Sequence, residues 1–85
     1  MELNQIGQVT EIVKSSLYCL NGKTRLMAVE LIINLNKIKT SKIDDQLVSL
    51  EELKKKCDFN QLKRELMNCN YLDETEKTLL QNFFE

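Results

Sequence analysis

The side chains that most often carry enzyme chemistry are scarce in this 85-residue chain, which has no histidine and only three cysteines. Without histidine, the usual general base and the commonest zinc ligand are both missing. Cys19, Cys57 and Cys69 are far apart and form no Cys-x-x-Cys pair. We therefore expect no metal site, and we interpret all three cysteines as reduced thiols of a cytoplasmic protein.

Other motifs that would bind a cofactor or perform catalysis are also missing. Neither Gly7 nor Gly22 belongs to a phosphate-binding loop, and no serine-hydrolase or metalloprotease motif is present. Acidic residues cluster at 44–45 and 73–76, without the central glycine that a calcium-binding loop requires. We interpret these carboxylates as helix caps or solvated side chains. The expectation is a protein with no cofactor and no catalytic residues, and so not an enzyme.

The elements that position the remaining side chains are expected to be helices. Apolar residues recur every three or four positions along most of the chain, which is the period of an α-helix. The absence of proline and the two glycines argue against the many turns of a β-sandwich. We predict a single all-α domain over residues 1–85, a small bundle of four to five helices. The expected helices span residues 3–20, 24–39, 50–57, 60–71 and 74–84.

Local signals suggest where these helices begin and end. Asn21-Gly22 is expected to end the first helix, with a β-hairpin turn as the alternative meaning of the pair. Residues 49–52, Ser-Leu-Glu-Glu, match a capping box and predict a helix that begins at Leu50. The weakly patterned residues 39–48 are expected to form a loop, with a short strand or a helical turn at residues 43–48 as alternatives.

The segment 24–39 is the most apolar of the chain. Hydrophobic residues occupy most of the circumference of the expected helix, with Thr24 as its N-cap. We expect this helix to be central and covered on more than one side. Its β-branched residues leave a buried strand as the minority interpretation.

Charge and hydropathy limit the location of the protein. The net charge is −1, with a basic excess in residues 23–64 and an acidic excess in residues 65–85. The first residues lack the apolar core of a signal peptide, and the longest apolar stretch, 26–35, is too short to cross a bilayer. We expect a cytoplasmic protein that does not insert into membranes.

Residues 49–72 have the rhythm of two capped helices separated by a short break at 58–60. This stretch resembles the core of helix-turn-helix and winged-helix domains. The resemblance implies nucleic-acid binding, with the second helix reading bases and the lysines before the turn contacting phosphates. The residues it implicates are Lys54, Lys55, Lys56, Gln61, Lys63, Arg64 and Asn68. Against this alternative, the chain is acidic overall, whereas a nucleic-acid-binding surface needs a clear positive excess.

A stripe of large apolar side chains ends the chain at Leu79, Leu80, Phe83 and Phe84. Such a stripe either completes the protein's own core or docks on another chain. Together with the small size and the lack of reactive groups, it favours a protein-interaction module, such as a regulator, inhibitor or adaptor. We expect the partner to be another protein, a second copy of this chain in a homodimer, or both. A nucleic-acid-binding regulator is the second hypothesis.

Overall fold

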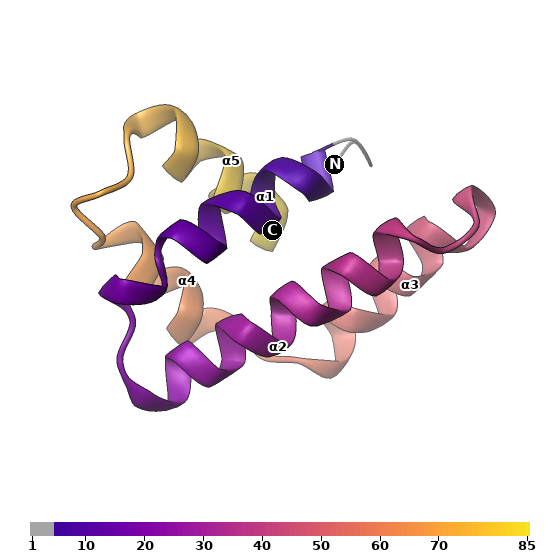
Figure 1. Cartoon of the computed structure of the whole chain (residues 1–85), viewed down its shortest axis with the longest axis horizontal. Coiled ribbons are helices and arrows are strands. Elements are labelled where there is room, and N and C mark those ends of the chain that lie inside the picture. Colours follow the sequence, from indigo (N-terminus) through magenta and orange to yellow (C-terminus); the bar gives the residue numbers. More distant parts are fainter. Residues whose placement is uncertain (1–4) are drawn as a thin grey trace.

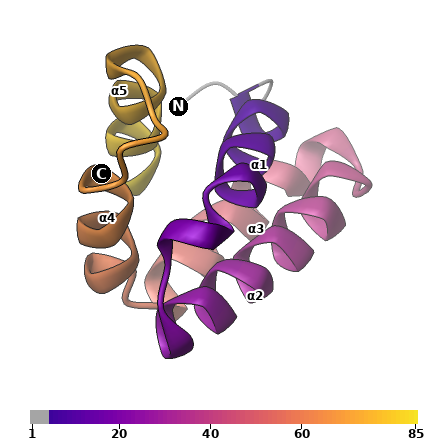
Figure 2. The same ribbon diagram turned by 60° about the vertical axis from the view of Figure 1, so that its left-hand side comes forward.

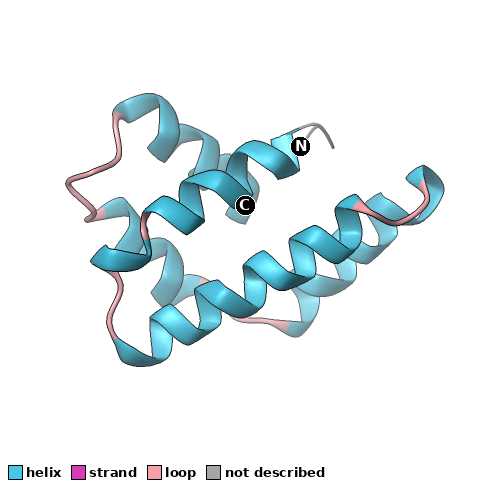
Figure 3. Ribbon diagram, in the orientation of Figure 1, coloured by secondary structure: helices cyan, strands magenta, loops and turns pink. Residues whose placement is uncertain are grey.

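The computed structural model describes residues 5–85, which form five α-helices, one short 3₁₀ turn (η1) and no strand within that range (Figures 1 and 3). The predicted all-α fold is therefore confirmed. The elements are α1 (Gln5–Ser15), η1 (Leu17–Cys19), α2 (Gly22–Lys39), α3 (Ile43–Lys56), α4 (Asn60–Met67) and α5 (Glu74–Phe84).

The longest helix, α2, organises the molecule. It pairs with α3 as an antiparallel helical hairpin, and the tip of this hairpin projects beyond the other helices (Figures 1 and 2). The other three helices gather at the opposite end of the hairpin, where α1 packs against α2 and α5 packs against both α1 and α4. Each helix thus buries one face, and the hairpin tip and the outer side of α2 are left without a covering helix.

The core lies where the helices converge and consists almost entirely of aliphatic side chains. Burial of this apolar surface is the main favourable contribution to folding, at roughly 25 cal/mol per Å² removed from water. The largest fully buried side chains include Phe83 from α5, Ile6 from α1 and Leu31 from α2. The expected helical period therefore does bring residues that are distant in sequence into one cluster.

The first helix is shorter than predicted, and its predicted residues 3 and 4 lie outside the described range. The structure ends α1 at Ser15, whereas the apolar pattern predicted a helix to residue 20. The hydroxyls of Ser15 and Ser16 both donate to the carbonyl of Ile12, at 3.0 and 2.7 Å. Serine side chains compete in this way for helix carbonyls, and the chain continues as the tighter η1 turn.

The Asn21-Gly22 pair starts a helix rather than ending one. Gly22 is the first residue of α2, no glycine has a positive φ among the described residues, and Asn21 occupies the N-cap position in an extended conformation. Both the predicted glycine stop and the alternative hairpin are therefore wrong. Thr24 is also not the N-cap: it is buried, and its hydroxyl donates to Glu65 on α4.

The predicted start of α3 is seven residues too late. The expected loop is limited to residues 40–42, and residues 43–48 are helical, so the strand alternative is wrong and the helical one is nearer to the structure. Ser49 lies inside α3 instead of capping it. Asp44 and Asp45 occupy the first turn, where carboxylates interact favourably with the helix dipole. The Gln46 amide donates to the carbonyls of Lys39 and Ser41, which ties the start of α3 to the end of α2.

Signals in the last third of the chain were more accurate. The Asp58 carboxylate accepts from the backbone N–H of Asn60 at 2.9 Å, and α4 begins there as predicted. It ends at Met67, four residues earlier than predicted. Helix α5 spans the predicted residues, and Asp73 and Glu76 form a reciprocal capping box at its start.

A disulfide bond joins Cys19 to Cys69 across 50 residues of sequence, with the two Cα atoms 5.9 Å apart. The expectation of three reduced thiols is therefore wrong for this pair. Only Cys57 keeps an unpaired and exposed thiol among the described residues. The early end of α4 explains the pairing, because the turn after Met67 brings Cys69 against η1.

Candidate functional site

The predicted C-terminal stripe separates into buried and half-buried residues. Leu80 and Phe83 are completely buried and belong to the core of the chain itself, so a partner cannot reach them in this fold. Leu79 and Phe84 are half-buried and pack around the edge of that core. Of the four residues, only these two remain accessible, and they lie in different places on the surface.

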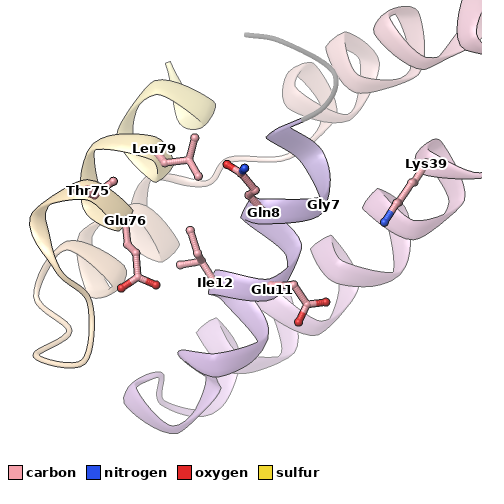
Figure 4. Close-up of a pocket in the computed structure, with 8 residues that line it drawn as sticks. All are labelled: Gly7, Gln8, Glu11, Ile12, Lys39, Thr75, Glu76 and Leu79. Atoms are coloured by element: carbon pink, nitrogen blue, oxygen red, sulfur yellow. The ribbon is translucent and has the colours of Figure 1, made fainter.

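Leu79 lines a groove of about 650 Å³ beside α1 (Figure 4). Ile12 and Leu79 supply its apolar walls, Glu11 and Glu76 its carboxylates, and Lys39 approaches from the far end of α2. The groove is broad and open, and its acidic and basic side chains are mixed. No set of charges points to one ligand there, so the groove does not define a site.

Phe84 lies at a second position, next to Phe59, with the two ring centroids 5.5 Å apart. Both rings line a hollow of about 180 Å³, together with Lys54 and Lys63. The ammonium of Lys54 is 4.8 Å from the ring centroid of Phe83 and contacts the carbonyl of Glu85 at 3.4 Å. Partial burial lowers the pKa of Lys54. This half-buried lysine therefore packs beside the protein's own aromatic side chains.

The remaining residues of the nucleic-acid hypothesis surround α4 without forming one surface. The predicted arrangement of two helices and a three-residue connection is present in α3 and α4, although α3 starts earlier. Gln61 donates to Glu65 at 3.0 Å, and Lys63 faces the hollow beside Phe84. Exposed positions among the seven are Lys55, Lys56, Gln61, Arg64 and Asn68. Nucleic-acid binding stays a prediction, with two of its lysines turned toward the protein's own aromatic residues.

The largest unexpected feature is an apolar line on α2 that faces solvent. Leu26, Val29 and Ile33 are 67%, 37% and 48% exposed, although the opposite side of the same helix is buried. The spacing of three and four residues places them along one line, which we call the outward face of α2. The opposite line of the helix is buried and comprises Thr24, Ala28, Leu31, Leu35 and Ile38.

The outward face corrects one expectation: its apolar stripe was visible in the sequence, but its exposure was not. The all-round hydrophobicity of segment 24–39 predicted a helix covered on more than one side, but no other helix of the described residues covers the outward face. The segment carries two stripes with coiled-coil spacing, on opposite sides of the helix. Separating these stripes would have shown that one of them could stay exposed, without showing which one.

Charges beside the outward face are predominantly basic. Helix α2 carries four basic residues and one acidic residue, all exposed: Lys23, Arg25, Lys37, Lys39 and Glu30. The Arg25 guanidinium also donates to the carbonyls of Leu17 and Leu20, at 3.2 and 3.0 Å, and so holds η1 against the start of α2. Lys39 reaches the groove beside α1 instead, so the basic residues that remain near the apolar line are Lys23, Arg25 and Lys37.

Comparison of the chain with protein-family models, curated proteins and solved structures found no match. Function has to be argued from the geometry alone. Between residues 5 and 85, no helix has the length and hydropathy needed to span a bilayer. No group of three histidine, cysteine or acidic residues is placed to hold a metal ion in the same range.

Proposed function

We propose that this protein is a non-enzymatic interaction module that binds an acidic amphipathic helix of a partner protein on the outward face of α2. The observation that carries the proposal is the exposure of Leu26, Val29 and Ile33 in one line. Isolated exposed apolar residues are common, but a continuous apolar stripe on a helix is typical of a helix-docking surface. Here it is the central helix that carries this stripe.

The stripe is large enough to contribute useful binding energy. Complete burial of one large aliphatic side chain is worth about 1.5–3 kcal/mol, and these three are between one-third and two-thirds exposed. Docking a partner helix would remove that remaining surface from water. The gain has to exceed the entropy lost on association, so we expect a moderate affinity, typical of a regulatory contact.

The charges of α2 favour a partner helix of opposite charge. By the helical period, Lys23 and Lys37 lie on one side of the apolar stripe and Arg25 on the other. These charges favour a helix whose own flanks carry aspartate or glutamate, as charged flanking positions do in coiled coils. Such charges raise the association rate and discriminate against basic partners more than they raise affinity. Glu30 is the exception, and it favours one basic residue near the middle of the bound helix.

A designed peptide provides a probe. It has about three heptads with leucine at the core positions and glutamate at the flanking positions, and its control has lysine at the flanking positions. Fluorescence anisotropy should detect binding of the acidic peptide and little or no binding of the basic one. Increasing salt should weaken the binding.

Variants locate the bound peptide on the protein. Leu26→Ser combined with Ile33→Ser should weaken binding at least tenfold, since each tenfold corresponds to about 1.4 kcal/mol. Ile43→Ser is the matched control, because Ile43 is an exposed aliphatic residue on a different helix, α3. Equal binding of the two peptides, or equal loss in all variants, would refute the proposal.

The same experiment distinguishes a second copy of this chain as the occupant. Sedimentation at several concentrations measures self-association, which the small core led us to expect. A dimer that dissociates in the Leu26→Ser, Ile33→Ser variant, together with failure to bind the acidic peptide, would replace the proposed partner by the chain itself. A cytoplasmic location belongs to the same proposal, although the disulfide removes the cysteine argument for it.

A further inference from the structure

The Cys19–Cys69 disulfide occupies the junction between the two ends of the fold. Cys19 ends η1, just before α2, and Cys69 follows the end of α4. No other covalent bond besides the backbone connects the α1–α2 part to the α4–α5 part among residues 5–85. The state of this bond therefore affects how tightly the two parts are held together.

A surface hollow of about 270 Å³ gives solvent access to the bond. Both cysteines line it, together with Glu65, Asn68, Asn70 and Tyr71. Cys19 is half-buried, whereas Cys69 is only 3% exposed. A small thiolate that enters the hollow meets Cys19 as the more accessible half of the disulfide.

Hydrogen bonds from Thr24 and Asn21 to Glu65, which we call the polar clamp, lie beside the disulfide and join the α1–α2 part to the α4–α5 part. The Glu65 carboxylate, one helical turn before Cys69, accepts hydrogen bonds from the Thr24 hydroxyl and from the backbone N–H of Asn21. Asn21 is two residues after Cys19. When the disulfide opens, this clamp and the shared core keep the two cysteines close, which favours formation of the same bond again.

We propose that Cys19–Cys69 is a reversible modification site, at which a low-molecular-weight thiol forms a mixed disulfide with Cys19 and then releases both cysteines in reduced form. The hollow shares no residue with the outward face of α2, and the proposal does not depend on the proposed function. Its consequence is a looser junction between η1, α2 and α4.

The chemistry is ordinary thiol–disulfide exchange. The incoming thiolate bonds to Sγ of Cys19, the Cys19–Cys69 bond breaks, and its electron pair leaves on Sγ of Cys69, which takes a proton from water. A second thiolate attacks the sulfur of the first thiol in the mixed disulfide and releases the Cys19 thiolate. Two thiols are oxidised to one disulfide, and the protein gains two electrons and two protons.

Glutathione is the probe, with the Cys57→Ser variant as starting material so that only the two paired cysteines react. After purification without reductant, this variant should resist alkylation. Millimolar reduced glutathione should make two cysteines alkylatable, and a brief treatment should add one glutathione to the peptide containing Cys19. Excess oxidised glutathione should then restore the unreactive protein.

Thermal unfolding reports the consequence for the fold. Reduction should lower the melting temperature by roughly 15–30 °C, the effect expected for opening a loop of about 50 residues in a domain of this size. Two alkylatable cysteines in the untreated Cys57→Ser protein would contradict the proposal. Resistance of the folded protein to glutathione, or glutathione on Cys69 alone, would contradict it as well.

Glu65→Gln tests the role of the clamp in reversibility. Glutamine keeps the size of the side chain but loses the charge that accepts from Thr24 and Asn21. Re-formation of the disulfide after reduction should become several-fold slower, while Asn70→Ala, another residue of the hollow, should leave the rate unchanged. Equal re-oxidation rates in the two variants would show that the clamp does not hold the cysteines together.

Discussion

The carboxylate of Glu65 on α4 accepts a hydrogen bond from the buried hydroxyl of Thr24 on α2, across 41 residues of sequence. The backbone N–H of Asn21 and the side chain of Gln61 donate to the same carboxylate, at 3.3 and 3.0 Å. The donors at Thr24 and Asn21 belong to the start of α2 and hold it against α4, whereas Gln61 lies on α4 itself and steadies the carboxylate. One glutamate thereby connects the helix that carries the outward face to the other end of the fold.

The pH dependence of stability should reflect this glutamate. The Thr24 hydroxyl above all, followed by Gln61, holds the pKa of Glu65 below its ordinary value of 4.5, partly offset by burial. Because the pKa is lower in the folded state, Glu65 stabilises the fold fully above pH 4.5. That contribution is lost as the pH falls through the lowered pKa. Urea unfolding at pH 7 and pH 3 should show a smaller pH-dependent loss in Glu65→Gln than in the wild type. An identical loss would contradict the hydrogen bonds described here.

The capping box of α5 should contribute more to the free energy of unfolding than Ser49, which the sequence suggested as the cap of α3. Asp73→Ala removes the acceptor for the Glu76 N–H and should lower the free energy of unfolding by about 1 kcal/mol. Ser49→Ala should be neutral or stabilise slightly, because Ser49 lies inside α3, where alanine is the better helix former. Chemical denaturation of both variants checks the pair. A larger loss for Ser49→Ala would place the start of α3 at Leu50 after all.

The aromatic end of the chain should behave as core. Phe83→Ala empties a fully buried position and should lower the free energy of unfolding by about 3–5 kcal/mol, which is enough to unfold a marginal domain. Tyr71→Ala is the control, since Tyr71 is 78% exposed and should change stability little. A folded Phe83→Ala protein with unchanged stability would show that Phe83 is an interface residue instead.

Gly7 should tolerate a methyl group. It lies inside α1 without a positive φ, and an added Cβ would meet only the end of the Lys39 side chain, at 3.4 Å. Gly7→Ala should therefore raise the free energy of unfolding by up to about 1 kcal/mol, the helix-propensity difference between the two residues. A rise in melting temperature would confirm this. A fall would show that the space beside Gly7 is narrower than the structure indicates.

The fold class and the helix at 74–84 were predictable because their signals are local. The apolar period needs only neighbours three or four residues apart, and the Asp73–Glu76 box closes within one turn. The start of α3 was mispredicted from equally local information. Ser49 matched a cap, but Asp44, Asp45 and the bonds from Gln46 to the end of α2 extend the helix backward. Where two local signals predict different helix starts, tertiary contacts such as these hydrogen bonds determine which start is used.

The disulfide and the outward face of α2 depend on contacts that no local pattern contains. Cys19 and Cys69 are 50 residues apart, and their pairing requires α4 to end early and turn back onto η1. The apolar period of α2 does not reveal which of its two stripes the other helices cover. Because α1, α3 and α4 pack against the rest of α2, Leu26, Val29 and Ile33 remain in solvent.

Amide chemical-shift mapping is the most direct test of the central claim, that the outward face of α2 is a docking surface. The isotope-labelled protein is titrated with the acidic amphipathic peptide, and the shift of every backbone amide is followed. We predict that the largest changes fall on residues 23–37 of α2, and that Leu26→Ser with Ile33→Ser abolishes them. Changes centred on α5 or on the groove beside α1, or no changes at all, would contradict the account.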